Sequence, residues 1–262
     1  MHAVVIDRIR DSAALIPKVA VALGVTAYDV RASLQVEGGG PAILAVLADP
    51  AAAESTAAAL RSVGVEAVTR DVAATSAAIG DFAVRRFEFG PTGLSLDTRD
   101  GRTAEVPYAS VDAIVLACAI ISTEHTEVVR ERKFSPGRSL LTGGLINTRT
   151  RDTTQRQTHV DSEEIAFVFA GGAEAYRLGE ASLVFQGLGA AIQPSRTANF
   201  QYLLAQLRQR CTGAAIDERL RKRAQQAQLL GRVLSPDDHL ELAVALVAAH
   251  LRSRRGAPYR AG

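Results

Sequence analysis

The centre of the sequence places two apolar, strand-like runs on either side of a long basic stretch. The runs are VDAIVLACAII (111–121) and EIAFVF (164–169), and residues 130–158 between them contain seven basic residues against two acidic ones. Connections longer than about 15 residues are uncommon inside compact domains, where they are usually functional or disordered. We interpret 130–158 as a loop whose ends are held by a sheet, and as the first place to look for function.

Two features make this basic loop a candidate binding segment. Arginine pairs with carboxylates or phosphates, and the middle of the loop, LLTGGLI (140–146), is apolar, as in segments that dock on a partner. The candidate partner- or anion-contacting residues are Arg130, Arg132, Lys133, Arg138, Leu140, Leu141, Gly143, Gly144, Arg149, Arg151 and Arg156. The alternatives are a solvated excursion, or a contact with the chain's own N-terminal part or with a sister subunit.

Composition indicates a globular protein with an aliphatic core. Apolar residues make up 47%, charged residues 22% and aromatic residues 5% of the chain. The net charge of +2 is too balanced to argue nucleic-acid binding by charge alone. Because the N-terminus does not resemble a signal peptide and no apolar run reaches the roughly 20 residues that cross a bilayer, we expect a cytoplasmic protein. Cys118 and Cys211 lie in apolar patterns and are interpreted as buried, reduced thiols.

The first 73 residues predict a small domain of order β-α-α-β-α-β. Its expected elements are a short strand at AVVI, helices over 12–23 and 27–34, a buried strand over 42–49, a helix ending at Gly64 and a strand over 65–72. Thr26 is a suitable cap for the second helix, and Asp49-Pro50 begins the third. Pro17 would break an interior hydrogen bond, so the first helix is expected to begin near Ile16.

This order, and some local sequence, resembles the C-terminal domain of the bacterial ribosomal stalk protein over residues 12–70. The similar features are Gly24-Val25 before the Tyr28–Leu34 helix, Pro41 before a strand, and the run from Ala53 to Val68. The resemblance implies a fold and a protein-docking role. The lysines with which that family contacts translation factors are not matched, because only Lys18 and Arg31 are basic on the first two helices, so factor binding is not transferred.

Residues 18–34 also fit a helix-turn-helix. Ala20, Gly24 and Val30 have the spacing that packs two short helices around a tight turn. In that case Arg31 could read a base in the major groove. Since the helix offers one arginine beside Asp29, without further phosphate-binding residues, core packing is favoured over DNA binding.

Residues 81–212 predict an antiparallel sheet of six or seven strands covered by one helix. The strands are expected over 82–89, 93–98, 103–108, 108–121, 164–170 and 174–185, with a hairpin turn at Asp100-Gly101. The helix begins at Ser195 and places Phe200, Leu203, Leu204, Leu207 and Cys211 on one face. The Asp-Gly hairpin followed by Val106-Pro107-Tyr108, Val111 and Ile114 looks like a bacterial pleckstrin-homology-like domain. That resemblance implies a module that binds peptides, proteins or lipid headgroups, although no lipid-binding motif is matched.

Two more helices are expected at the C-terminus, over 214–231 and from Ser235 onward, followed by a disordered GAPYRAG tail. The last helix has a wide apolar face, which fits packing within the chain or against a partner or second subunit. The three predicted domains are therefore 1–73, 81–212 and a helical hairpin at 213–256, in an α+β fold.

Motifs for chemistry are missing from the sequence. No histidine lies in a nucleophile, zinc or acid–base motif, no phosphate-binding loop matches, and Glu124, His125 and Glu127 are interpreted as solvated. We expect no catalytic residues, no metal and no cofactor. The favoured function is a non-enzymatic protein-interaction, scaffold or assembly module, self-association included. The alternative is an anion- or nucleic-acid-binding regulatory protein that uses 130–158 or 18–34.

Overall fold

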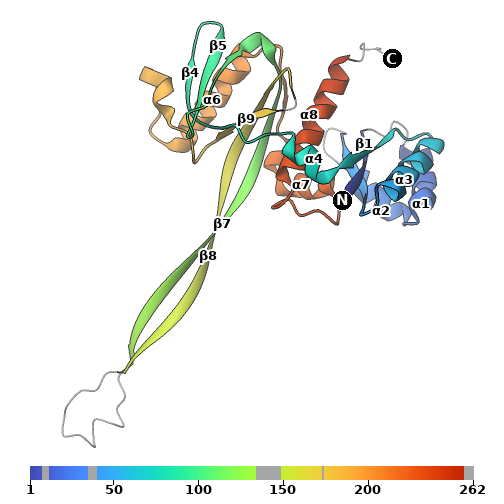
Figure 1. Cartoon of the computed structure of the whole chain (residues 1–262), viewed down its shortest axis with the longest axis horizontal. Helices are drawn as coiled ribbons and strands as arrows, with labels where there is room; N and C mark the ends of the chain where they lie inside the picture. The colour runs from blue at the N-terminus through green and yellow to red at the C-terminus, as the bar shows by residue number, and fades with distance from the viewer. Residues whose placement is uncertain (8–11, 35–39, 134–148, 173, 257–262) are drawn as a thin grey trace, which may run out of the picture. The chain divides into compact units, whose positions relative to one another are not determined.

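The computed structural model describes residues 1–7, 12–34, 40–133, 149–172 and 174–256 (Figure 1). For residues 12–13, 121–133, 149–161 and 255–256 it describes the backbone alone. The elements in chain order are β1 (His2–Ile6), α1 (Ser12–Leu23), α2 (Ala27–Leu34), β2 (Ala42–Leu47), α3 (Pro50–Ser62), β3 (Ala67–Asp71), α4 (Val72–Ala77), β4 (Ala83–Phe89), β5 (Gly93–Thr98), β6 (Thr103–Pro107), β7 (Val111–Lys133), β8 (Arg149–Ala170), β9 (Ala175–Gly179), α6 (Arg196–Arg210), β10 (Ala215–Asp217), α7 (Arg223–Leu230) and α8 (Leu240–Gly256). Short 3-10 helices lie at Tyr108–Ser110, Phe185–Ala191 and Arg219–Arg221. The α+β fold class is confirmed.

The N-terminal part has the predicted β-α-α-β-α-β order, because local capping signals fix its helices. Thr26 Oγ1 accepts a hydrogen bond from the Asp29 backbone N–H (3.1 Å) and starts α2, and Asp49 accepts from Ala51 and Ala52 to start α3. The three strands form an antiparallel sheet of order β2-β1-β3. The resemblance to the ribosomal stalk domain stays a prediction.

Two expectations for this part are wrong. Helix α1 begins at Ser12 and contains Pro17, rather than beginning near Ile16. The buried side chains of Ile16, Val19 and Ala20 hold this helix on the sheet, and such packing outweighs the one hydrogen bond that the proline removes. Strand β2 lies at the sheet edge, so only its first two residues are buried and residues 44–47 are half-buried.

The larger sheet has seven strands in the order β10-β7-β8-β9-β4-β5-β6. It is mixed rather than antiparallel, since β10 pairs parallel with β7 and β9 pairs parallel with β4. Helix α6 begins at the predicted cap, Ser195, and its apolar face packs on this sheet in a core that includes Phe200, Leu203, Ile114 and Ala166. The pleckstrin-homology-like resemblance stays a prediction.

The prediction of a helix over 214–231 is wrong in its first half, where the structure has strand β10. Ile216 pairs with Ile114 of β7, and the helix α7 begins only at Arg223. Pairing with a buried strand therefore overrides the helical spacing of the local sequence. Other bounds also differ from expectation: β9 ends at Gly179 rather than continuing to 185, and α8 begins at Leu240, after a turn at Ser235–Asp238.

One hydrophobic core joins both sheets to the C-terminal helices. It contains Val5 and Ile43 from the small sheet, Val115 and Phe167 from the large sheet, and Val244 from α8. The apolar face of α8 thus packs within the chain, which decides between the two alternatives for this helix. The opposite face of the small sheet packs on α1 and α3 in a separate core.

The described chain divides into two compact units. The first comprises residues 1–119 and 163–262, and the second comprises Ile120–Ser162. The predicted boundaries of the domains 1–73, 81–212 and 213–256 stay predictions, although all three contribute side chains to the shared core. None of the described helices has the length and apolar character needed to cross a membrane.

Candidate functional site

The basic segment belongs to two unusually long neighbouring strands. β7 has 23 residues and β8 has 22, whereas strands of globular proteins usually have about 3–10. The two are adjacent in the sheet and can be followed side by side in Figure 1. We call Ile120–Ser162, the second compact unit, the ribbon unit. At a rise of about 3.3 Å per residue, a strand of this length spans roughly 75 Å.

The interpretation of 130–158 as a loop is therefore corrected at both ends. Arg130, Arg132 and Lys133 lie in β7, and Arg149, Arg151 and Arg156 lie in β8. The other predicted contact residues, Arg138, Leu140, Leu141, Gly143 and Gly144, fall in 134–148, outside the described residues. Threonine and valine, which favour strands, are frequent in 122–129 and 150–160, and this signal could have extended both strands.

The ends of β7 and β8 that belong to the first unit are firmly anchored. Residues 113–117 of β7 and 165–169 of β8 are buried, and their alternate side chains enter the two cores on opposite faces of the sheet. Beyond these buried residues, both strands contain few aliphatic residues. In 121–133 and 149–161 the only aliphatic residues are Ile121, Val128, Val129 and Val160. A polar two-stranded ribbon is at best marginally stable alone in water.

The basic excess is confined to residues 130–158, because the ribbon unit as a whole also contains Glu124, Glu127 and Asp161 and has seven basic and five acidic residues. Residues 130–158 have five more basic than acidic residues, whereas the whole chain has an excess of only two. The remainder is therefore acidic by three charges. The arrangement favours contact between this segment and an acidic surface or polymer.

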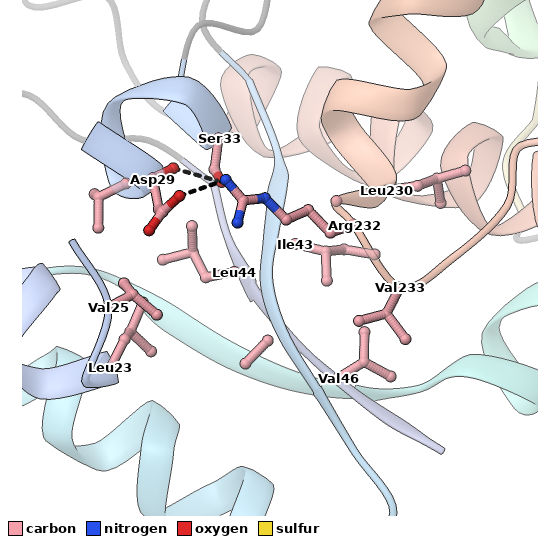
Figure 2. Close-up of a pocket in the computed structure, with 13 residues that line it drawn as sticks. Leu23, Val25, Asp29, Ser33, Ile43, Leu44, Val46, Leu230, Arg232 and Val233 are labelled. Atoms are coloured by element: carbon pink, nitrogen blue, oxygen red, sulfur yellow. Dashed lines mark hydrogen bonds and ion pairs between the residues drawn. The ribbon is translucent and has the colours of Figure 1, made fainter. Parts of the chain in front are cut away.

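A second candidate site lies at the edge of the small sheet, in a cleft of about 180 Å³. Figure 2 shows that β2 runs through it, with α2 on one side and the end of α7 on the other. Its lining is mostly aliphatic and comes from three stretches, 23–33, 43–46 and 230–233. Hereafter we call it the edge cleft.

Asp29 and Arg232 form an ion pair across the edge cleft, although 203 residues separate them in the sequence (Figure 2). One carboxylate oxygen of Asp29 accepts from Thr26 Oγ1 (2.7 Å), and the other accepts from the Arg232 guanidinium. The hydrogen bond from Thr26 and then that from Arg232 lower the pKa of Asp29, so the carboxylate stays charged. Sequence reasoning missed this site because no local pattern connects Asp29 with Arg232.

Among the remaining polar clusters, the pair of His250 and Asp7 contains a buried histidine. His250 Nδ1 lies 2.5 Å from Asp7 Oδ1, and its Nε2 is buried without a partner in the described part of the chain. The hydrogen bond with His250 lowers the pKa of Asp7. Ser253 Oγ also faces Asp7, at 3.4 Å, so the serine lies on the carboxylate side of the pair and not beside Nε2, as a nucleophile would need.

Other predicted residues find ordinary structural places. Cys211 is buried, and burial raises the pKa of its thiol, whereas Cys118 is only half-buried; within the described residues neither cysteine forms a disulfide. On α2, Val30 is buried and Arg31 is exposed. Within the described residues, no group of three or more histidine, cysteine or acidic side chains is placed to hold a metal.

No protein-family model, curated protein or solved structure matches this chain.

Proposed function

We propose that this protein is a non-enzymatic interaction module and that the ribbon unit contacts its partner, in a protein complex or a homo-oligomer. The observation that carries the proposal is the pair of strands β7 and β8, which are anchored in the core at one end and form a separate unit at the other. A ribbon with few aliphatic residues gains little stability from its own packing. Its extended strands, which carry most of the basic residues of 130–158, are suited to a partner surface that supplies the missing contacts. The proposal retains the cytoplasmic location expected from the sequence.

Removal of the ribbon unit tests this function. Ala119 and Glu163 can be joined by an Asn-Gly turn, which closes neighbouring strands. The full chain and the shortened chain are compared by sedimentation velocity and by chemical cross-linking under the same conditions. We expect the full chain to self-associate or to cross-link reproducibly to a partner, and the shortened chain to remain folded and monomeric. A full chain that is monomeric and yields the same cross-linked proteins as the shortened chain contradicts the proposal.

A second function, binding of nucleic acid, is supported by the basic excess on a two-stranded ribbon. The major groove of DNA admits such a ribbon, and arginines bind phosphates or guanine edges. We rank it second because the whole chain has a net charge of only +2. Its test is fluorescence anisotropy with a duplex of about 30 base pairs between about 50 and 200 mM salt. Binding that weakens steeply with salt and is lost with the ribbon unit supports it, and a flat response removes it.

A further inference from the structure

The two edges of the small sheet differ in how their backbone groups are satisfied. At the β3 edge, Arg61 Nη1 donates a hydrogen bond to the carbonyl of Ala67 (2.9 Å). For β2, the described residues supply no hydrogen bond to the backbone of 42–47 other than those of its pairing with β1. An edge strand with unpaired N–H and C=O groups is a template for another strand. The β2 edge is therefore chemically complementary to an extended peptide.

The edge cleft adds a side-chain pocket to this open edge. Its wall contains Val25 and Val233, which are 44% and 66% exposed, so apolar surface faces solvent beside the strand. A cavity of about 150 Å³ holds a benzene-sized ligand. The edge cleft, at about 180 Å³, has room for one aliphatic side chain such as leucine or isoleucine.

Gly231 places the chain that follows α7 beside the start of β2. It has a φ of +74°, and a Cβ at this position would lie 3.0 Å from the Ile43 carbonyl oxygen. This close approach covers β2 at Ile43 and leaves residues 44–47 half-buried. The part of the β2 edge that is open to another strand is therefore 44–47, directly after the residue that Gly231 covers.

Arg232 gives the edge cleft a charge preference. Its side chain is 75% exposed, and one terminal nitrogen, Nη2, donates to Asp29. A guanidinium has five N–H donors, and within the described residues the others have no partner. Asp29 thus holds the arginine at the rim, where its free donors can bind a carboxylate on an incoming peptide.

We propose that the edge cleft binds an extended peptide of a protein partner as an additional strand on β2, with an aliphatic side chain in the cavity and a carboxylate on Arg232. Main-chain hydrogen bonds supply affinity in this mode of recognition, and the pocket and the arginine supply specificity. The site is independent of the ribbon unit. The shortened chain without residues 120–162 is therefore expected to keep it, which separates a failure of this proposal from a failure of the proposed function.

The test uses a fluorescent probe peptide, acetyl-Thr-Val-Thr-Leu-Thr-Val-Glu, and the full chain. We expect saturable binding with a Kd of about 10–100 μM by anisotropy, and slower amide hydrogen exchange at 44–47 in the bound state. A probe with proline in place of the central leucine and its neighbours lacks the N–H donors and should not bind. A probe that ends in a lysine amide should bind about threefold to tenfold more weakly, because it places no carboxylate at Arg232.

Two cleft variants and two matched controls localise the binding. Val233→Asp, at an exposed position, should weaken the acidic probe at least about tenfold. Arg232→Gln should abolish the difference between the acidic and lysine-amide probes. The controls lie on the opposite edge: Val68→Asp replaces a valine that is 45% exposed, and Arg70→Gln replaces an exposed arginine. Both controls should bind the probes as the wild type does.

Several results would overturn the proposal. One is no binding of the acidic probe at about 1 mM, a concentration that detects even weak complexes. Another is binding that the proline probe and Val233→Asp leave unchanged. A third is a concentration-dependent dimer that Val233→Asp disrupts and the probe does not, which would assign the cleft to a second copy of this chain.

Discussion

At the scale of single residues, the contact between Asp7 and His250 connects the two ends of the chain. Asp7 follows β1, and His250 lies in α8 with its side chain almost completely buried. A buried polar side chain that loses its hydrogen-bond partner retains the full cost of desolvation. This pair therefore contributes stability that depends on the charge of Asp7.

The pH dependence of stability should follow from Asp7. The hydrogen bond with His250 lowers the pKa of Asp7 below its value of about 3.9 in unfolded chains. Between these two pKa values the unfolded state binds more protons, so stability is fully present above about pH 4 and is lost as the pH falls through the folded-state pKa. We expect Asp7→Asn to flatten the acid side of a urea-unfolding series over about pH 4 to 2, and to lower stability at pH 7 by about 1–2 kcal/mol. The control is Asp97→Asn, at an exposed position of β5; if it flattens the profile equally, Asp7 is not the cause.

Gly231 offers a prediction about backbone shape at the edge cleft. Gly231 has a φ of +74° and a ψ of −165°, a conformation that is almost restricted to glycine, so Gly231→Ala costs about 1–3 kcal/mol in backbone strain, and it adds a methyl group 3.0 Å from Ile43 O. Gly101→Ala is the matched control, because Gly101 has a φ of +84° with no heavy atom within 4 Å of the added Cβ. We expect Gly231→Ala to lower the free energy of unfolding by about 1 kcal/mol more than Gly101→Ala does. Equal losses in chemical denaturation would mean that neither the backbone conformation of Gly231 nor its close approach to β2 constrains the fold.

At the scale of elements, α8 is held to the large sheet by an ion pair as well as by its apolar face. Arg252 Nε lies 3.1 Å from both carboxylate oxygens of Asp112, and its Nη2 lies 2.9 Å from one of them. The Arg252 Cζ is also 5.0 Å from the centre of the Phe169 ring. A planar guanidinium can make both contacts at once, and an ammonium group cannot make the paired hydrogen bonds.

Substitutions of Arg252 should therefore separate charge from geometry. We expect Arg252→Gln to destabilise the fold by about 1–2 kcal/mol, and Arg252→Lys to recover less than half of that loss. A double-mutant cycle with Asp112→Asn should show a coupling energy of about 1 kcal/mol in thermal or urea unfolding. Full recovery by lysine would show that charge alone matters.

How far the sequence could predict each element depends on whether local residues or long-range pairing determine it. The helices α2, α3 and α6 were predictable because Thr26, Asp49 and Ser195 cap them locally. Strand β10 was not, because its pairing with β7 overrides a helical pattern. The long parts of β7 and β8 were missed since their polar residues lack the apolar alternation of a half-buried strand.

The two candidate sites also differ in how far the sequence could predict them. The basic residues of 130–158 are close together in the sequence, so their charge excess could be recognised, although their strands were not predicted. The edge cleft depends on Asp29 and Arg232, which only the folded chain brings together. Long-range packing of that kind leaves no periodic signal in either segment.

At the scale of the whole molecule, the first unit combines two sheets through one shared core. Residues 1–80 include the three-stranded sheet, and one face of it carries Ala3, Val5 and Ile43 into the core with α7, α8 and the large sheet. Burial of an aliphatic side chain contributes about 1.5–3 kcal/mol. A fragment that exposes this face loses several such contributions, which is comparable with the total stability of a small domain.

We therefore expect residues 1–80 not to fold alone, although their β-α-α-β-α-β order resembles that of a separate domain. The fragment should show a broad, non-cooperative thermal transition by circular dichroism and should bind a hydrophobic dye. The shortened chain that lacks 120–162 should instead melt cooperatively, within a few degrees of the full chain, because the buried residues of β7 and β8 stay in place. A fragment 1–80 with a sharp transition and dispersed amide NMR signals would show that the shared core is not needed for its fold. It would then support the predicted domain boundary near residue 73.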